Sequence, residues 1–258
     1  MSFFVDTMRI KVKRSLLMLR RVLALSLLLL LLAPAIAQDM PIEPVVATIT
    51  ADDGVTLVGD FYAHDDNAPT VMLMHMLGSQ RSAWLPLIPA LLDAGYNVLN
   101  VDLRGHGESE GSRDWDAARA DIQLWLQWLR EQPAVDGEHI AIIGASIGAN
   151  LALIGCADDE QCVTAIALSP GEDYRGVQPA PALTEGLAER SALLIGSQGD
   201  GPAREAMAAF ILASRGNIAV RLYDGRAHGT NLFNDKLESV QNAILAWLEE
   251  HLVTSESE

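Results

Sequence analysis

A serine stands between two glycines in the stretch Gly-Ala-Ser-Ile-Gly, whose central residue is Ser146, where an apolar run passes into a helix-like run. Glycines permit a tight turn there, and a G-x-S-x-G pattern between a strand and a helix is typical of a serine raised as a nucleophile. The alternative is an ordinary turn, because glycine and serine are common turn residues. A serine hydroxyl attacks well only when a base removes its proton, so nucleophilic catalysis would also require a histidine and an acid.

His228 and Asp200 could complete such a group. His228 lies in LYDGRAHGTNL, after the last apolar run and before the final helical stretch, and it is the only histidine in this late loop. Asp200 follows the apolar run SALLIGS and precedes a helix-like segment, where an aspartate could instead be a helix N-cap. Asp224, at the end of the strand before His228, is the second choice. The acid would hold the histidine in the tautomer that accepts the serine proton.

Acyl transfer also requires two N–H donors for the negative oxygen of the tetrahedral intermediate. One should be the backbone N–H of Ile147, directly after the serine. The other should come from the loop 75–79, which reads HMLGS and follows another apolar run. The residues thus predict nucleophilic acyl transfer, with Ser146 as nucleophile, His228 as base and Asp200 as acid.

Short apolar runs that alternate with helical stretches must position these residues. VVATITADDGVTLVGDFYA alternates apolar and polar residues on both sides of Asp53-Gly54 and predicts an antiparallel hairpin. Six further runs predict strands: TVMLMHM, NVLNVDL, HIAIIGA, VTAIALS, SALLIGS and IAVRLYD. Helical segments between and after them include 81–95 and 237–252. We therefore expect an α/β fold with a mostly parallel eight-stranded sheet, helices on both faces, and a site where the strands end.

Residues 1–37 read as a secretory signal peptide. A basic segment up to Arg21 is followed by VLALSLLLLLLAPAIA, which ends in small residues before Gln38. This run is shorter than the roughly 20 residues that a spanning helix needs, so we expect cleavage; a retained membrane anchor is the alternative. Residues 38–258 would then form one domain, exported to the periplasm or the cell exterior, with no stable membrane association.

The formal net charge of −16 makes the chain acidic. An acidic surface repels nucleic acid, and no basic stripe or aromatic ladder occurs in the sequence, so nucleic-acid binding is not expected. His, Cys and Asp do not occur at metal-ligand spacing, and neither usual phosphate-binding glycine loop occurs. We therefore expect no metal and no cofactor.

The two cysteines, Cys156 and Cys162, lie close together in GCADDEQC. In an exported protein they could form a disulfide across the loop that ends a helix, with a structural role. The alternative is a pair of buried free thiols.

Six motifs occur in one order along the chain: HMLGS, DLRGHGES, GASIGA, LSPGEDYRG, GSQGD and RAHG. With them the chain resembles the α/β-hydrolase superfamily, in the branch of small, lidless dienelactone-hydrolase-like serine esterases. The resemblance covers nearly all of residues 38–258. It implies the chain order nucleophile, acid, histidine, which Ser146, Asp200 and His228 follow. It also implies that DLRGHGES forms a structural turn beside the site.

The chain departs from this family in two places. The family usually has His-Gly before the second oxyanion donor, whereas this chain has His75-Met76. By position the donor should be the N–H of Leu77, with Met76 as the alternative. Dienelactone hydrolases proper use a cysteine nucleophile, so the serine here does not imply opening of dienelactones.

Relatives carry substrate-contacting loops or a cap after the sixth strand. Residues 170–190 are too few for a folded cap, so the resemblance implies an open pocket with Met76, Leu77, Trp84 and Tyr174 at its mouth. For Trp84 the alternative is packing within its own helix.

These observations predict a carboxylesterase that cleaves small to medium esters through an acyl-enzyme, with a small-molecule ester as its partner. A peptidase, thioesterase or lysophospholipase on the same triad is the alternative, as is a non-catalytic binding protein that retains the fold. No particular oligomeric state is predicted.

Overall fold

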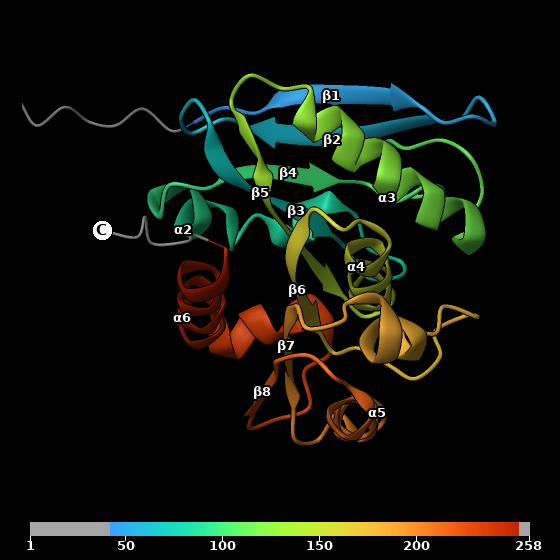
Figure 1. The fold of residues 1–258 in the computed structure, drawn as a ribbon, viewed down its shortest axis with the longest axis vertical. Coiled ribbons are helices and arrows are strands. Elements are labelled where there is room, and N and C mark those ends of the chain that lie inside the picture. Colours follow the sequence, from blue (N-terminus) through green and yellow to red (C-terminus); the bar gives the residue numbers. More distant parts are fainter. Residues whose placement is uncertain (1–41, 253–258) are drawn as a thin grey trace, which may run out of the picture. The chain divides into compact units, whose positions relative to one another are not determined.

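One β-sheet organises the computed structural model, which describes residues 42–252 (Figure 1). The predicted signal segment, residues 1–37, lies outside the described residues. The strands are β1 (Val45–Thr50), β2 (Thr56–Tyr62), β3 (Ala68–Met74), β4 (Asn97–Val101), β5 (Val135–Ala145), β6 (Cys162–Leu168), β7 (Ser191–Ser197) and β8 (Ile218–Tyr223).

The strands are ordered β1-β2-β4-β3-β5-β6-β7-β8 across the sheet. β1 and β2 form the expected antiparallel hairpin, and β2 also runs antiparallel to β4. All neighbours from β4 to β8 run parallel. The carboxyl ends of β5, β6, β7 and β8 therefore lie side by side at one edge of the sheet, and the predicted architecture is confirmed.

Helices cover the sheet on both faces (Figure 1). Within residues 42–252 they are α2 (Ile88–Asp93), α3 (Trp115–Arg130), α4 (Ile147–Asp158), α5 (Gly201–Ala213) and α6 (Phe233–His251). Alternate residues of a strand point to opposite faces. Accordingly Met72 and Met74 of β3 pack in the core with α3, α4 and α5, whereas Val71 and Leu73 pack with α2 and α6. No helix in this part of the chain is both long and apolar enough to cross a membrane.

The segment 81–95 was expected to be helical throughout, and it is interrupted instead. It contains a 3-10 turn, Arg81–Trp84, and then α2. Pro86 lies in the interruption, and proline both removes an N–H and disfavours helical geometry at the preceding residue. Trp84 was predicted at the mouth of the pocket, and this is wrong. Its side chain is fully buried and packs edge-to-face on Phe233, with ring centroids 5.7 Å apart.

The connection between β6 and β7 remains short. Tyr174 pairs with Val177 in an isolated antiparallel bridge, and Ala182–Gly186 forms one π-helical turn. The segment is too small to fold as a separate domain, as the sequence predicted. It contacts α4 and places Tyr174 beside His228, at the carboxyl ends of the strands.

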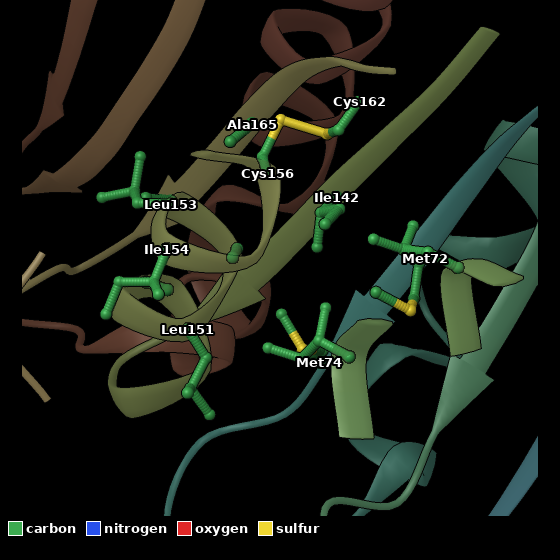
Figure 2. Packing of buried hydrophobic residues seen from close by; sticks show 14 of the residues in the cluster. Met72, Met74, Ile142, Leu151, Leu153, Ile154, Cys156, Cys162 and Ala165 are labelled. Carbon is green, nitrogen blue, oxygen red and sulfur yellow. A yellow bond between two sulfur atoms is a disulfide. The ribbon is translucent and has the colours of Figure 1, made fainter. Parts of the chain in front are cut away.

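A disulfide joins Cys156, in the last turn of α4, to Cys162, the first residue of β6. Both cysteines are buried, and Figure 2 shows their bond among the apolar side chains of the core. The guanidinium of Arg190 lies at the same place and donates to the carbonyl oxygens of Cys156, Asp159 and Cys162 at 2.7–2.8 Å. The carboxyl end of α4 is thus held by a covalent bond and by a cation that satisfies otherwise unpaired carbonyls.

Candidate active site

Ser146 occupies a sharp turn between β5 and α4, in a backbone conformation that residues other than glycine rarely adopt. Its φ is 54° and its ψ is −119°. The two flanking glycines are required by close contacts: a Cβ on Gly144 would collide with the backbone of Gly148, and a Cβ on Gly148 would lie 2.5 Å from the carbonyl oxygen of Met74. The Ser146 N–H donates to the carbonyl of Leu168 in β6 at 2.8 Å, which ties the turn to the neighbouring strand.

The structure brings the predicted serine, histidine and acid into one hydrogen-bonded row. Nε2 of His228 lies 2.7 Å from Oγ of Ser146, and Nδ1 lies 2.7 Å from Oδ2 of Asp200. Only 9% of the Asp200 side chain is exposed, against 36% for His228, so the imidazole is open to solvent on one side while its acid is shielded. Asp224, the second choice, is exposed, and within the described residues the acid bonded to His228 is Asp200. This arrangement can pass the serine proton to the imidazole.

His75 organises the loop that follows β3. Its Nδ1–H donates to the carbonyl of Met76 at 2.9 Å, and its Nε2 accepts from the N–H of Leu103 at 3.0 Å. One ring nitrogen therefore carries a hydrogen and the other does not, so the ring is neutral. Burial of the side chain lowers the pKa of His75 to about 4, which keeps it neutral at ordinary pH. The carbonyl of Met76 also accepts from the N–H of Ser79 at 3.1 Å.

The side chains of Met76 and Leu77 are both partly buried but pack in different places. The sulfur of Met76 lies 3.8 Å from Oγ1 of Thr230, beside the loop that carries His228. Leu77 packs against the core on the α3 and α4 face. Ile147, the first residue of α4, is almost fully buried. The N–H groups in the first turn of a helix have no intrahelical acceptor, so that of Ile147 is available at the turn.

Tyr174 lies next to the histidine. Its ring meets the His228 ring edge-to-face, with centroids 6.1 Å apart, and its hydroxyl donates to the carbonyl of Ser169 at 3.2 Å. Burial of the phenol raises the pKa of Tyr174 to about 12, so the hydroxyl keeps its proton. The side chain is half-buried, as expected for a residue at the edge of a site.

Three polar residues around the site were not singled out from the sequence. Asn150 in α4 bonds both to the N–H and to the carbonyl of Gly171, and it also donates to the carbonyl of Val177, which fixes the segment that bears Tyr174. Ser169 and Ser197 follow or end neighbouring strands and bond to the loop of His228. In the sequence, the two serines could have been found from their position at the carboxyl ends of apolar runs, where the site was expected. Within residues 42–252 no group of three or more His, Cys, Asp or Glu side chains is arranged to hold a metal ion.

A model of the alpha/beta hydrolase family matches residues 71–253. Among curated proteins, the chain is 32% identical over 143 residues to the uncharacterized protein YfhR of Salmonella typhi, covering 50% of this chain and 49% of that protein. It is 30% identical over 156 residues to the polyketide transferase grgF of Penicillium sp., covering 58% and 53% of the two chains. The chain spans about half the length of these curated relatives.

Solved structures match over a larger share of the chain. The esterase Pf2001 of Pyrococcus furiosus matches with a TM-score of 0.71 at 21% identity, over 84% of this chain and 94% of the esterase. The dienelactone hydrolase of Anabaena variabilis ATCC 29413 matches with a TM-score of 0.67 at 18% identity, over 82% and 100%. At these identities the likeness concerns the fold, which is the one expected from the sequence motifs.

Proposed function

The chain belongs to the alpha/beta hydrolase family, and from that premise we propose that it is an exported serine hydrolase that cleaves small to medium carboxylic esters. The row of hydrogen bonds from Ser146 through His228 to Asp200, 2.7 Å at each step, carries this proposal. Nucleophile, base and acid in hydrogen-bond contact are the arrangement that activates a serine hydroxyl.

The reaction would proceed in two acyl transfers. Ser146 Oγ attacks the ester carbonyl while His228 takes its proton, and the same proton then passes to the departing alcohol. The carbon–oxygen bond of the ester breaks, and the acyl group remains on the serine. His228 next removes a proton from water, the hydroxide attacks the acyl-enzyme, and the carboxylic acid leaves as Ser146 regains its proton. Asp200 stabilises the imidazolium in both halves.

The oxyanion of each tetrahedral intermediate would accept hydrogen bonds from the N–H groups of Ile147 and Leu77. The position of Ile147 at the start of α4 supports its role, because the helix dipole adds positive potential there. The direction of the Met76 carbonyl supports Leu77 over Met76. That carbonyl points to the His75 ring, and in a trans peptide the N–H of the following residue, Leu77, points the opposite way.

Substrate contacts are proposed for Tyr174, Met76 and Leu77. The Tyr174 ring edge against His228 supports a place beside the reacting carbonyl, and the partly buried apolar side chains of Met76 and Leu77 suit an organic acyl or alcohol group. A small-molecule ester needs less help for its leaving group than an amide does, which favours esters over peptides. Comparison of the turnover of simple esters, thioesters and lysophospholipids tests the alternative of a thioesterase or lysophospholipase activity on the same three residues.

Export is the second part of the proposal. The buried Cys156–Cys162 disulfide supports it, because disulfides persist in oxidising compartments and are rare in the cytosol of mesophiles. The leader in residues 1–37 would direct the chain to the periplasm or the cell exterior. Intact mass of the secreted protein tests this: a mass for residues 38–258 is expected, and the mass of the whole chain would indicate a retained anchor.

Acyl transfer to an acceptor other than water is a second candidate function. The likeness to a protein named polyketide transferase favours it, because a transferase and an esterase share the acyl-enzyme step and differ in what attacks it. Product analysis with an added alcohol separates them. Transfer predicts that the new ester exceeds the free acid at millimolar alcohol, whereas a hydrolase releases mainly acid.

The first test is labelling of the full chain with a fluorophosphonate, which reacts with activated serines whatever the natural substrate. We expect the wild type to label and both Ser146→Ala and His228→Ala to remain unlabelled. Ser191→Ala is the matched control, because Ser191 is a buried serine bonded to Thr164 at the opposite end of β7, and it should label normally. A folded wild type that does not label would favour a non-catalytic binding protein, and labelling of Ser146→Ala would mean that another serine is the nucleophile.

A further inference from the structure

We propose that Ser169 and Ser197 are positioning residues that together hold the main chain of His228 in its working orientation. This inference rests on the proposed function, in which His228 is the base. Neither serine lies within the row that would move the proton. Each hydroxyl instead forms a hydrogen bond to the loop that carries His228. The two serines lie at the ends of two neighbouring strands.

The two hydroxyls bond to the two peptide groups that flank the His228 Cα. Oγ of Ser197 donates to the carbonyl of Ala227 at 2.8 Å, and this carbonyl belongs to the peptide before His228. Oγ of Ser169 accepts from the N–H of Gly229 at 3.0 Å, and this N–H belongs to the peptide after it. Peptide groups are rigid planes, so a bond to each one restrains φ and ψ of His228, which are −117° and 133°.

The sheet topology explains why these serines reach the loop. β6, β7 and β8 are adjacent and parallel, so their carboxyl ends lie in a row. Ser169 directly follows β6, Ser197 ends β7, and His228 lies in the loop after β8. Both serines are fully buried, so no water competes for their hydroxyls.

Ser169 is itself held in an unusual conformation that aims its hydroxyl. Its φ is 54°, a left-handed value that is uncommon for residues other than glycine. The N–H of Ser169 donates to the carbonyl of Ile195 at 2.7 Å, and its own carbonyl accepts from the hydroxyl of Tyr174. Both sides of the serine backbone are thus fixed while the side chain points to Gly229.

The rest of the loop is tied at a greater distance from the histidine. The N–H of Gln198 donates to the carbonyl of Tyr223, and that of Gly199 to the carbonyl of Gly225, both at 2.8 Å. These bonds would keep the loop folded if a hydroxyl were lost. Next to His228 itself, the chain is held by the two serine hydroxyls and by the N–H of Asn231, which donates to the His228 carbonyl at 3.1 Å. Loss of a hydroxyl should therefore displace the imidazole without unfolding the loop.

Loss of position should affect the rate of chemistry more than the binding of substrate. An imidazole shifted by about 1 Å can cost about 100-fold in rate, because proton transfer depends steeply on alignment. The substrate would contact other groups, so KM should change little. A purely structural serine would lower stability without this separation of kcat from KM.

The experiment compares four variants of the full chain: Ser169→Ala, Ser197→Ala, Ser197→Thr and Ser191→Ala. Ser191 is the matched control, a buried serine at the start of β7 whose hydroxyl bonds to Thr164. Ser197→Thr keeps the hydroxyl and suits a strand. For each variant we would measure the melting temperature, kcat and KM for p-nitrophenyl acetate, and the rate of fluorophosphonate labelling.

We expect Ser169→Ala and Ser197→Ala each to lower kcat and the labelling rate by about 10- to 100-fold, with KM changed less than about threefold. Ser197→Thr should recover most of the rate, and Ser191→Ala should match the wild type in rate even if it melts earlier. If one alanine variant fails to fold, the other still decides the question.

Two results would overturn the inference. In the first, the wild type labels and turns over, and Ser169→Ala and Ser197→Ala are as fast as the control Ser191→Ala. The proposed function would then stand, but the two serines would have no positioning role. A folded wild type with neither labelling nor turnover would overturn the proposed function and this inference together.

Discussion

At the scale of single residues, the geometry around His228 defines one productive tautomer. Asp200 faces Nδ1 and Ser146 faces Nε2, so the hydrogen must lie on Nδ1 for Nε2 to accept the serine proton. A carboxylate accepts from Nδ1–H, whereas an amide could present its NH₂ group there and favour the opposite tautomer.

Asp200→Asn should therefore lower kcat by about 10⁴-fold with little change in fold. Asp224→Asn is the control, since Asp224 is an exposed aspartate close to the same histidine in sequence. It should retain wild-type activity on p-nitrophenyl acetate. A loss in Asp224→Asn alone would assign the acid to Asp224, and equal losses in the two variants would contradict the assignment to Asp200 alone.

At the scale of elements, α4 joins the proposed nucleophile to the disulfide. Ser146 precedes its first residue, and Cys156 lies in its last turn. The disulfide closes a short loop, with a sequence separation of 6, so it should restrict the unfolded chain only moderately.

Replacing Cys156 and Cys162 together by alanine should lower the free energy of unfolding by about 2 kcal/mol. The Arg190 bonds to the end of α4 remain in that variant, so we expect the rate of fluorophosphonate labelling at 25 °C to stay near that of the wild type. Urea unfolding of the double variant measures the first effect. A large loss of labelling in the folded variant would show that the far end of α4 controls the serine.

Asn150 links α4 to the segment that carries Tyr174. Asn150→Ala leaves the buried N–H and carbonyl of Gly171 without this partner, so it should destabilise the fold by about 1–3 kcal/mol. Loosening of the segment should raise KM for esters several-fold while kcat changes less. Gln123→Ala is the control, because Gln123 also bonds to a carbonyl, that of Gly155 within α4, and not to the segment that bears Tyr174. An unchanged KM in a folded Asn150→Ala variant would separate Tyr174 from substrate binding.

At the scale of the whole molecule, burial of His75 makes stability depend on pH. The unfolded chain protonates this residue below about pH 6.5, whereas burial lowers its pKa in the folded chain to about 4. Between these values the unfolded state binds more protons, so the free energy of unfolding falls as pH falls. His75 alone should remove about 3 kcal/mol between pH 7 and pH 4.

Urea unfolding of the wild type and His75→Gln at pH 7 and pH 4.5 measures this loss. His75→Gln should be less stable at pH 7 but should lose less on acidification than the wild type. His64→Gln serves as control, because His64 is partly exposed. Identical pH dependence in His75→Gln and the wild type would mean that other groups cause the acid sensitivity.

The sequence predicted the sheet closely because its strands are either alternating patterns, as in the hairpin, or short apolar runs between helical stretches, and SALLIGS coincides with β7 from Ser191 to Ser197. It also predicted which polar residues meet, since Ser146, Asp200 and His228 each follow a strand. It failed at Trp84, where the apolar pattern does not distinguish a core position from the wall of a pocket. The contacts of Ser169 and Ser197 with the His228 loop join segments far apart in sequence, and no local pattern records such contacts.

At Ser146 the backbone conformation favours glycine, whereas the proposed reaction requires a serine hydroxyl. Its φ of 54° suits glycine, so Ser146→Gly should exceed Ser146→Ala in free energy of unfolding by about 1–3 kcal/mol, as urea titration can measure. Equal stability of the two variants would mean that the turn holds no strain. Both lack the hydroxyl, so the difference isolates the backbone. Selection for stability alone would therefore favour glycine at this position. A serine here costs stability, and the proposed catalytic role of its hydroxyl would explain why it is kept.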